Sequence, residues 1–302
     1  MRFIPRKSRS FAAGLALCLL FHTGAASAET AAERDLGETV RDLEVELDAR
    51  IGVSIRDSAS DWEWNRREDE RFVMASTFKS VLCGAVLDRV DDGALALDQA
   101  VEIEAGDILD YAPVAEDHVG GTLTVGELCH ATLDLSDNTA ANLLIDRLGG
   151  PGEVTAFLRR IGDPVTRLDR MEPDLNLFVP GDPRDTTSPA AIRATWETML
   201  LGDALSPGAR ALLADWMSDG GVTGQLIRAH TPEDWQVADK SGGGRHHTRN
   251  LVAMVTPPGS APYFVAIFLS DTPADWSTRN TAVAEIAAGV VEILSARHAS
   301  VR

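Results

Sequence analysis

The chain has 302 residues, and its 28 Lys and Arg residues against 46 Asp and Glu residues give a formal net charge of −18. An acidic surface opposes the phosphate contacts that nucleic-acid binding requires, so nucleic acid is excluded as a partner. The length suffices for one large domain or two interleaved domains with a substantial core.

The first 28 residues have the pattern of a secretory signal peptide. Four basic residues within 2–9 precede an apolar run over 11–21, and Ala26, Ser27 and Ala28 follow. This pattern predicts export, with cleavage after Ala28 and a secreted, periplasmic protein. The run is shorter than the roughly 20 apolar residues of a membrane span, so no membrane anchor is expected. Lipid attachment at Cys18 is the alternative, although Leu17 stands where a small residue is usual.

After the predicted signal, the spacing of apolar residues alternates along the chain between a helical period and a strand period. Helical spacing or composition predicts helices, and β-branched or aromatic runs predict strands. The expected order is a helix at 31–49, strands at 51–56 and 61–64, helices at 76–90, 139–148, 152–161, 189–200 and 207–217, strands at 236–240, 250–255 and 263–269, and a helix at 280–296.

Five strands separated by a helical block must come together from both ends of the chain. We therefore expect an α/β fold with a five-stranded antiparallel sheet flanked by helices and an inserted all-α domain. The predicted division is an α/β domain at 29–66 and 219–302 and an all-α domain at 67–218, with a cleft between them.

Two cysteines, Cys83 and Cys129, follow the predicted signal. An even pair in an exported protein predicts a disulfide, and closing its loop would stabilise the fold by about 4 kcal/mol in the chain-entropy model. Two buried free thiols are the alternative.

Ser76 and Lys79 lie three residues apart at the start of the predicted buried helix. At this spacing both side chains share one helical face. A buried lysine that loses its proton helps to activate a serine nucleophile. A helix-capping serine beside a solvated lysine would give the same pattern. Lys79 and Lys240 are the only lysines after the signal, against 22 arginines. A compositional bias would explain the excess of arginine, but not why both lysines fall within the polar motifs of the chain.

Two further segments carry polar groups. In Ser136-Asp137-Asn138, an extended backbone would direct Ser136 and Asn138 to one side and Asp137 back into its loop, while any of the three is also a common helix N-cap. The segment 240–244 ends a predicted strand with Lys240, Ser241 and three glycines that would let a ligand approach the backbone, although a glycine-rich hairpin turn would have the same composition.

Together these segments match the combination S-x-x-K, S-D-N and K-T/S-G, and the chain resembles the class A serine β-lactamases from about 31 to 297, most closely their TEM and SHV group. The resemblance implies that Ser76 is the nucleophile, Lys79 its proton-transfer partner and Ser136 the relay to the ring nitrogen. It implies that the Ser76 and Gly243 amides form the oxyanion hole. Residues expected to bind the substrate are Lys240, Ser241, Gly242, Gly243, Arg249, Asn138 and, as cleft wall, Tyr111.

The segment 167–176 resembles the Ω-loop of that family. Glu172 and Asn176 would hold the water that attacks the acyl-enzyme, and an Arg170–Asp185 ion pair would close the loop. Either Lys79 or Glu172 could be the base for acylation. The resembled group also has the disulfide predicted above.

The expected activity is therefore hydrolysis of penicillins and some cephalosporins, which confers antibiotic resistance. A cell-wall peptidase and a penicillin-sensing module are the rival functions, and Glu172 with Asn176 disfavours both. No metal and no cofactor are expected, because the histidines show no metal-ligand spacing. A monomer is expected. A preference for penicillins is predicted, because Gly244, Arg245 and Arg249 are present and there is no cysteine pair at positions 75 and 244, which are Ala75 and Gly244.

Overall fold

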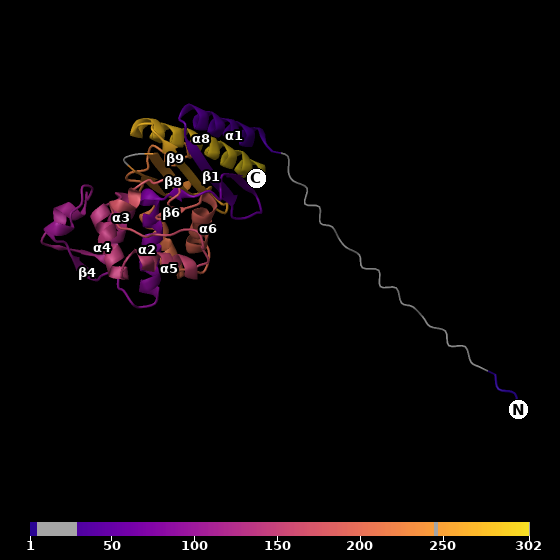
Figure 1. Ribbon diagram of the computed structural model, residues 1–302, viewed down its shortest axis with the longest axis horizontal. Helices are drawn as coiled ribbons and strands as arrows, with labels where there is room; N and C mark the ends of the chain where they lie inside the picture. Colours follow the sequence, from indigo (N-terminus) through magenta and orange to yellow (C-terminus); the bar gives the residue numbers. More distant parts are fainter. Residues whose placement is uncertain (5–28, 245–246, 302) are drawn as a thin grey trace.

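The computed structural model describes residues 1–4, 29–244 and 247–301 (Figure 1). The apolar run and cleavage site of the predicted signal, together with Arg245 and His246, lie outside the described residues. Within the described chain, no helix is both long and apolar enough to span a membrane.

A five-stranded sheet is formed by both ends of the chain. Its order is β2-β1-β9-β8-β7, and every neighbouring pair is antiparallel, which confirms the predicted fold class. The strands are β1 (Arg50–Asp57), β2 (Glu63–Arg66), β7 (Gln236–Gly243), β8 (His247–Thr256) and β9 (Tyr263–Thr272).

Strand β7 extends further than the pattern indicated. Ser241, Gly242 and Gly243 pair with Leu251, Asn250 and Arg249 of β8. The glycine-rich segment is therefore strand rather than hairpin turn, because its backbone forms a regular ladder with its neighbour.

Alternating residues of β9 pack into two separate cores. Val265, Ile267 and Leu269 face the core that contains α1 (Ala31–Glu46) and α8 (Trp276–Val301). Phe264 and Phe268 face the other core. Figure 1 shows α1 and α8 side by side over the sheet. On the opposite face α6 (Pro189–Leu200) packs against β1 and β9, although it belongs to the middle of the chain.

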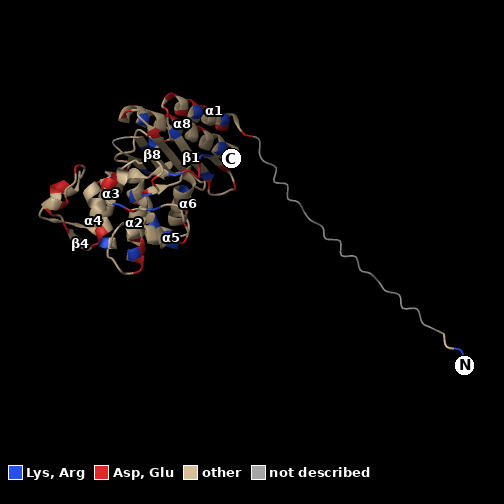
Figure 2. Cartoon of the chain, in the orientation of Figure 1, with Lys and Arg blue, Asp and Glu red and all other residues tan. Residues whose placement is uncertain are grey.

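Helix α2 (Phe78–Asp91) is the centre of the helical part. All side chains from Phe78 to Leu87 are buried, because neighbouring helices surround it. These neighbours are α3 (Val125–Asp134), α4 (Asn138–Leu148), α5 (Pro151–Arg160) and α7 (Pro207–Trp216), and two short strand pairs, β3 (Phe72–Val73) with β6 (Thr186–Thr187) and β4 (Ala100–Glu102) with β5 (Thr122–Thr124), complete the chain. In Figure 2, acidic residues occur over both parts and are interspersed with arginines.

The predicted disulfide is not formed in this structure. Cys83 of α2 and Cys129 of α3 are buried free thiols, and the Cys83 Sγ donates to the Cys129 carbonyl at 3.7 Å. Burial raises the pKa of the Cys83 thiol well above its usual value. The alternative of two buried free thiols therefore describes this structure.

Candidate functional site

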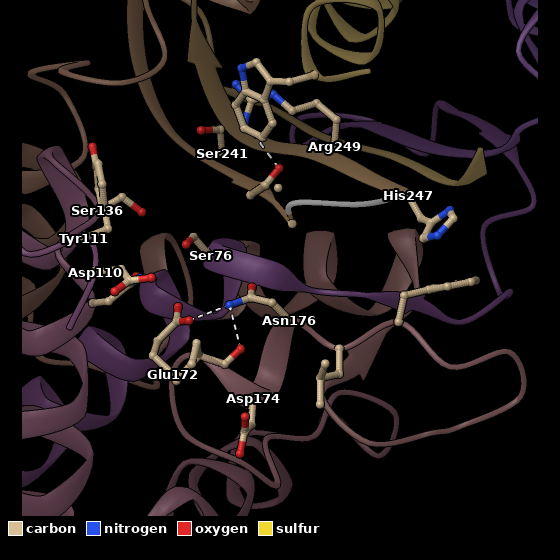
Figure 3. Close-up of a pocket in the computed structure, with 18 of the residues that line it drawn as sticks. Ser76, Asp110, Tyr111, Ser136, Glu172, Asp174, Asn176, Ser241, His247 and Arg249 are labelled. Carbon is tan, nitrogen blue, oxygen red and sulfur yellow. Dashed lines mark hydrogen bonds between the residues drawn. The ribbon is translucent and has the colours of Figure 1, made fainter. Parts of the chain in front are cut away.

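A pocket of about 840 Å³ lies between strand β7 and the helical part. In Figure 3, Ser76 lies between Glu172 and Asn176 on one side and Ser241 and Arg249 on the other. The residues that line it are Ser76, Asp110, Tyr111, Ser136, Asn138, Glu172, Pro173, Asp174, Asn176, Leu177, Phe178, Val222, Ser241, Gly242, Gly243, Gly244, His247, Arg249 and Trp276.

Ser76 lies in a single 3-10 turn, η1 (Ala75–Thr77), directly before α2. Ala75 has a φ of +44°, a backbone conformation that is uncommon for a residue with a side chain. The Asn250 amide of β8 donates to the Val73 and Met74 carbonyls, each at 2.9 Å, and so ties the sheet to the segment before the serine. The serine is thus held at a junction between the two parts of the protein.

Strand β7 approaches this junction closely at Gly242. A Cβ atom there would lie 2.7 Å from the Met74 oxygen and 3.1 Å from the Ser76 nitrogen. Only glycine fits without displacing one backbone from the other. The Ser76 amide and the end of β7 therefore border the same small space.

Lys79 is fully buried, so the alternative of a solvated lysine is wrong. Its Nζ donates to the Ser136 carbonyl at 2.7 Å, the Asn138 Oδ1 at 2.6 Å and the Ser136 Oγ at 3.3 Å. It also lies 3.5 Å from the Glu172 Oε1. Burial lowers the pKa of Lys79, while the neighbouring Glu172 charge opposes that shift.

Asp137 performs both roles considered for its segment. Its Oδ1 accepts from the Ala140 amide at 2.8 Å and caps α4, while its Oδ2 accepts from the Val114 and Ala115 amides. Ser136, beside it, has a φ of +61°. The buried aspartate thereby fixes the turn from which Ser136 and Asn138 reach Lys79.

Glu172 is buried at the floor of the pocket. Its Oε2 accepts from the Asn176 Nδ2 at 2.5 Å, and its Oε1 has no hydrogen-bond partner among the residues that the structure describes. The Asn142 side chain of α4 fixes the Glu172 backbone in both directions, at 2.9 Å each. The carboxylate is therefore held by Asn176 through one oxygen, while the other oxygen faces the Lys79 ammonium as an ion pair.

The predicted ion pair that closes this loop is confirmed. The Arg170 Nε donates to the Asp185 Oδ2 at 2.5 Å. Asp185 is fully buried and also accepts the Asp169 and Arg170 amides. The charged pair holds the two ends of the 167–185 segment together.

Two cations lie at the sheet side of the pocket. Burial, and next the charge of Lys79, lower the pKa of Lys240 to about 7. Arg249 is buried and its Nε donates to the Asn280 Oδ1 at 3.0 Å. Ser241 and Arg249 line the pocket, whereas Lys79 and Lys240 are fully buried and do not line it.

Of the predicted catalytic and substrate-binding residues, all except Lys79 and Lys240 line the pocket, and Lys79 contacts Ser136, Asn138 and Glu172, which do line it. Asn142, Asn250 and Trp276 are contributors that sequence reasoning missed. Asn142 and Asn250 act on backbone atoms of distant segments, and Trp276 precedes the predicted helix, so no local pattern distinguished them.

The structure also groups three potential metal ligands that the sequence analysis did not associate. His130, Asp134 and Asp219 offer ligand atoms within 4.8 Å of one another on the surface. His130 and Asp134 are four residues apart on α3, a spacing that does place both on one face. None of the three lines the pocket, and His130 already pairs with Asp219 at 2.7 Å.

Comparisons of the whole chain with known proteins give one consistent result. Residues 35–294 match the model of the β-lactamase enzyme family. A β-lactamase of Rhodobacter capsulatus is 50% identical over 97% of this chain and 99% of its own length. A β-lactamase structure from Xanthomonas campestris pv. campestris is 46% identical with a TM-score of 0.84, covering 87% of this chain and 98% of that one. A reconstructed ancestral class A β-lactamase of Gram-negative bacteria is 50% identical with a TM-score of 0.83, covering 85% and 99%.

The lowered pKa of Lys240 makes a directly measurable prediction. In protein labelled with ¹³C at the lysine Cε, the Lys240 signal should titrate near pH 7, because burial and the charge of Lys79 disfavour its ammonium form. The positive charge is therefore present below pH 7 and lost above it. Loss of one signal in Lys240→Arg assigns the resonance, and a midpoint near the ordinary value of 10.5 would contradict the prediction.

Proposed function

This chain belongs to the β-lactamase enzyme family, in class A, and we propose that it hydrolyses penicillins and some cephalosporins through an acyl-enzyme on Ser76. It is a hydrolase that acts on β-lactams. The proposal adds the substrates, the covalent intermediate and a role for each residue of the site.

In the acylation step the Ser76 Oγ attacks the lactam carbonyl. Its proton passes to the Lys79–Glu172 pair, whose atoms lie 3.5 Å apart, and Ser136 delivers a proton to the ring nitrogen as the C–N bond breaks. The position of Lys79 supports this path, because its buried amine donates to the carbonyl and hydroxyl oxygens of Ser136 and to the Asn138 Oδ1.

The charges of the substrate are matched by two groups of donors. The Ser76 and Gly243 amides would stabilise the developing oxyanion, a role supported by the close approach of β7 to η1. Lys240, Ser241 and Arg249 would hold the substrate carboxylate. Asn138 would bind the side-chain amide of the substrate, and Tyr111 would form the cleft wall. Tyr111 is about half exposed at the pocket mouth, as a contact wall requires.

In the deacylation step water attacks the ester carbonyl and Glu172 accepts its proton. The ester bond to Ser76 breaks, the Ser76 oxygen recovers a proton, and the ring-opened acid leaves. The placement of Glu172 is the observation that carries the proposal. Its Oε2 is fixed by Asn176 and its Oε1 lies 3.5 Å from the Lys79 Nζ in the lining of the pocket, where a carboxylate can accept the proton of an attacking water. No step requires a metal or a cofactor.

Removal of the proposed deacylation base should trap the covalent intermediate. Glu172→Ala should lower kcat for benzylpenicillin by roughly 10²–10⁴-fold, the usual contribution of a general base, and mass spectrometry should detect one added penicillin on the protein. Asp174→Ala is the matched control, because this carboxylate also lines the pocket and should leave no adduct.

Other outcomes identify the rival functions. A wild-type chain that stays acylated is a penicillin-sensing module, and one that acts on a D-Ala-D-Ala peptide instead is a cell-wall peptidase. Unimpaired turnover by Glu172→Ala would refute the role of Glu172.

We further propose that the enzyme prefers penicillins. The presence of Gly244, Arg245 and Arg249 in the sequence, without a cysteine pair at Ala75 and Gly244, supports this preference. We expect kcat/KM to decrease in the order ampicillin, cefotaxime, imipenem. Efficient hydrolysis of imipenem would contradict it.

We also propose two domains, an α/β domain at 29–66 and 219–302 and an all-α domain at 67–218. All strands of the large sheet fall within the first set of residues, and α2 to α5 with α7 fall within the second. The basic and apolar pattern at the N-terminus supports export to the periplasm without a membrane anchor, and we propose that the protein acts there as a monomer.

If the protein is exported, its cysteines meet an oxidising compartment and should form the predicted bridge. Protein recovered from the periplasm should carry no thiol that reacts with a thiol reagent after denaturation, whereas protein made in a reducing cytosol should carry both. The bridge should raise the free energy of unfolding by roughly 2–4 kcal/mol, and Cys129→Ser should abolish that gain. Two reactive thiols in periplasmic protein would contradict the prediction.

A further inference from the structure

Trp276, the first residue of α8, has no part in the function described so far. Its side chain lines the pocket and remains 49% exposed. The Arg249 guanidinium lies 4.7 Å from the centroid of its ring, and the Arg279 guanidinium lies 5.7 Å from it. Both distances are within the range of a cation–π interaction.

Arg249 needs such support because it is a buried cation close to another one. No Asp or Glu forms an ion pair with it within the described ranges 29–244 and 247–301, and its guanidinium donates to the Asn280 amide oxygen and to the Gly242 carbonyl. Burial, and next the charge of Arg279, lower the pKa of Arg249 to about 10. The negative face of the indole offsets part of this cost and leaves the guanidinium available to a carboxylate.

The same indole determines what residue fits at position 243. A Cβ atom on Gly243 would lie 2.6 Å and 2.8 Å from two ring carbons of Trp276, and 3.4 Å from the Arg249 Cδ. The ring edge therefore covers the glycine whose amide the mechanism assigns to the oxyanion hole. Trp276, Arg249 and Gly243 form one packed unit from α8, β8 and β7.

We propose that Trp276 is a positioning and specificity residue, whose indole fixes the Arg249 guanidinium toward the substrate carboxylate and restricts position 243 to glycine. This inference rests on the proposed function, since it concerns recognition of the β-lactam carboxylate in the same pocket. It assigns selectivity for carboxylate-bearing β-lactams to a contact outside the three sequence motifs.

The first test separates carboxylate recognition from general damage. Trp276→Leu should raise KM for benzylpenicillin about tenfold and change kcat less than about twofold, because a desolvated cation–π contact is of that size and orients a binding group. For the methyl ester of benzylpenicillin, KM should be nearly the same in the variant and the wild type. Trp276→Phe retains a ring and should recover most of the affinity for the acid.

A matched control is available on another face of the protein. The Arg297 guanidinium lies 4.0 Å from the ring centroid of Trp62, so Trp62→Leu removes the same kind of contact away from the pocket. It should leave both KM values unchanged. Equal increases in KM for the acid and the ester in Trp276→Leu, or no increase for either, would overturn the proposal.

The second test uses the contact between Trp276 and Gly243. Gly243→Ala alone should lower kcat/KM about tenfold, because the new methyl group displaces the indole or the strand. In the double variant with Trp276→Leu, kcat/KM should equal that of Trp276→Leu alone, since the obstructing ring is absent. Strictly additive losses would contradict the packed unit.

The outcomes for the wild type keep the two proposals distinguishable. Normal penicillin turnover with unchanged Trp276 variants refutes only the inference about Trp276. Acylation without turnover refutes hydrolysis, and the same variants are then compared by their rates of acylation. A wild type that neither reacts with nor hydrolyses penicillin refutes both.

Discussion

The complete burial of Lys79 is the constraint on which the rest of the site depends. An ammonium group removed from water must be surrounded by acceptors, because an isolated buried charge is very costly. Here the acceptors come from two separate segments, the turn at 136–138 and the loop at Glu172. Satisfying one side chain thus aligns the groups that the proposed reaction requires.

The proposed reactive residues could be selected from the sequence because each carries an unusual chemical group within a short motif, and Ser76, Ser136 and Glu172 all line one pocket. The five antiparallel strands and most helices were also predictable from periodicity, and the ion pair of Arg170 with Asp185 followed from the family resemblance. The roles of Asn142, Asn250 and Trp276 were not predictable, because each depends on a contact with a residue far away in the chain. Asn142 contacts Glu172, Asn250 contacts Val73 and Met74, and Trp276 contacts Arg249. The length of β7 was missed because its pairing with β8 outweighs the weak strand preference of glycine.

The unbonded cysteines and the surface group of His130, Asp134 and Asp219 illustrate another limit. Residue type and parity predicted a bridge, but its formation depends on the redox environment as well as on the proximity of the two thiols. His130 and Asp134 share one face of α3, and Asp219, after α7, joins them only through tertiary packing. In both cases the sequence contains the functional groups, while their state is set by surroundings that no local pattern describes.

The position of β9 has a consequence for how the molecule is made. This strand pairs with β1 on one side and β8 on the other, so the two halves of the sheet join only through one of the last segments to be synthesised. Pairings between such distant segments form slowly, because a long loop must close before any contact is gained. A nascent chain therefore cannot complete its sheet before synthesis is nearly finished, a delay that is compatible with the export proposed above.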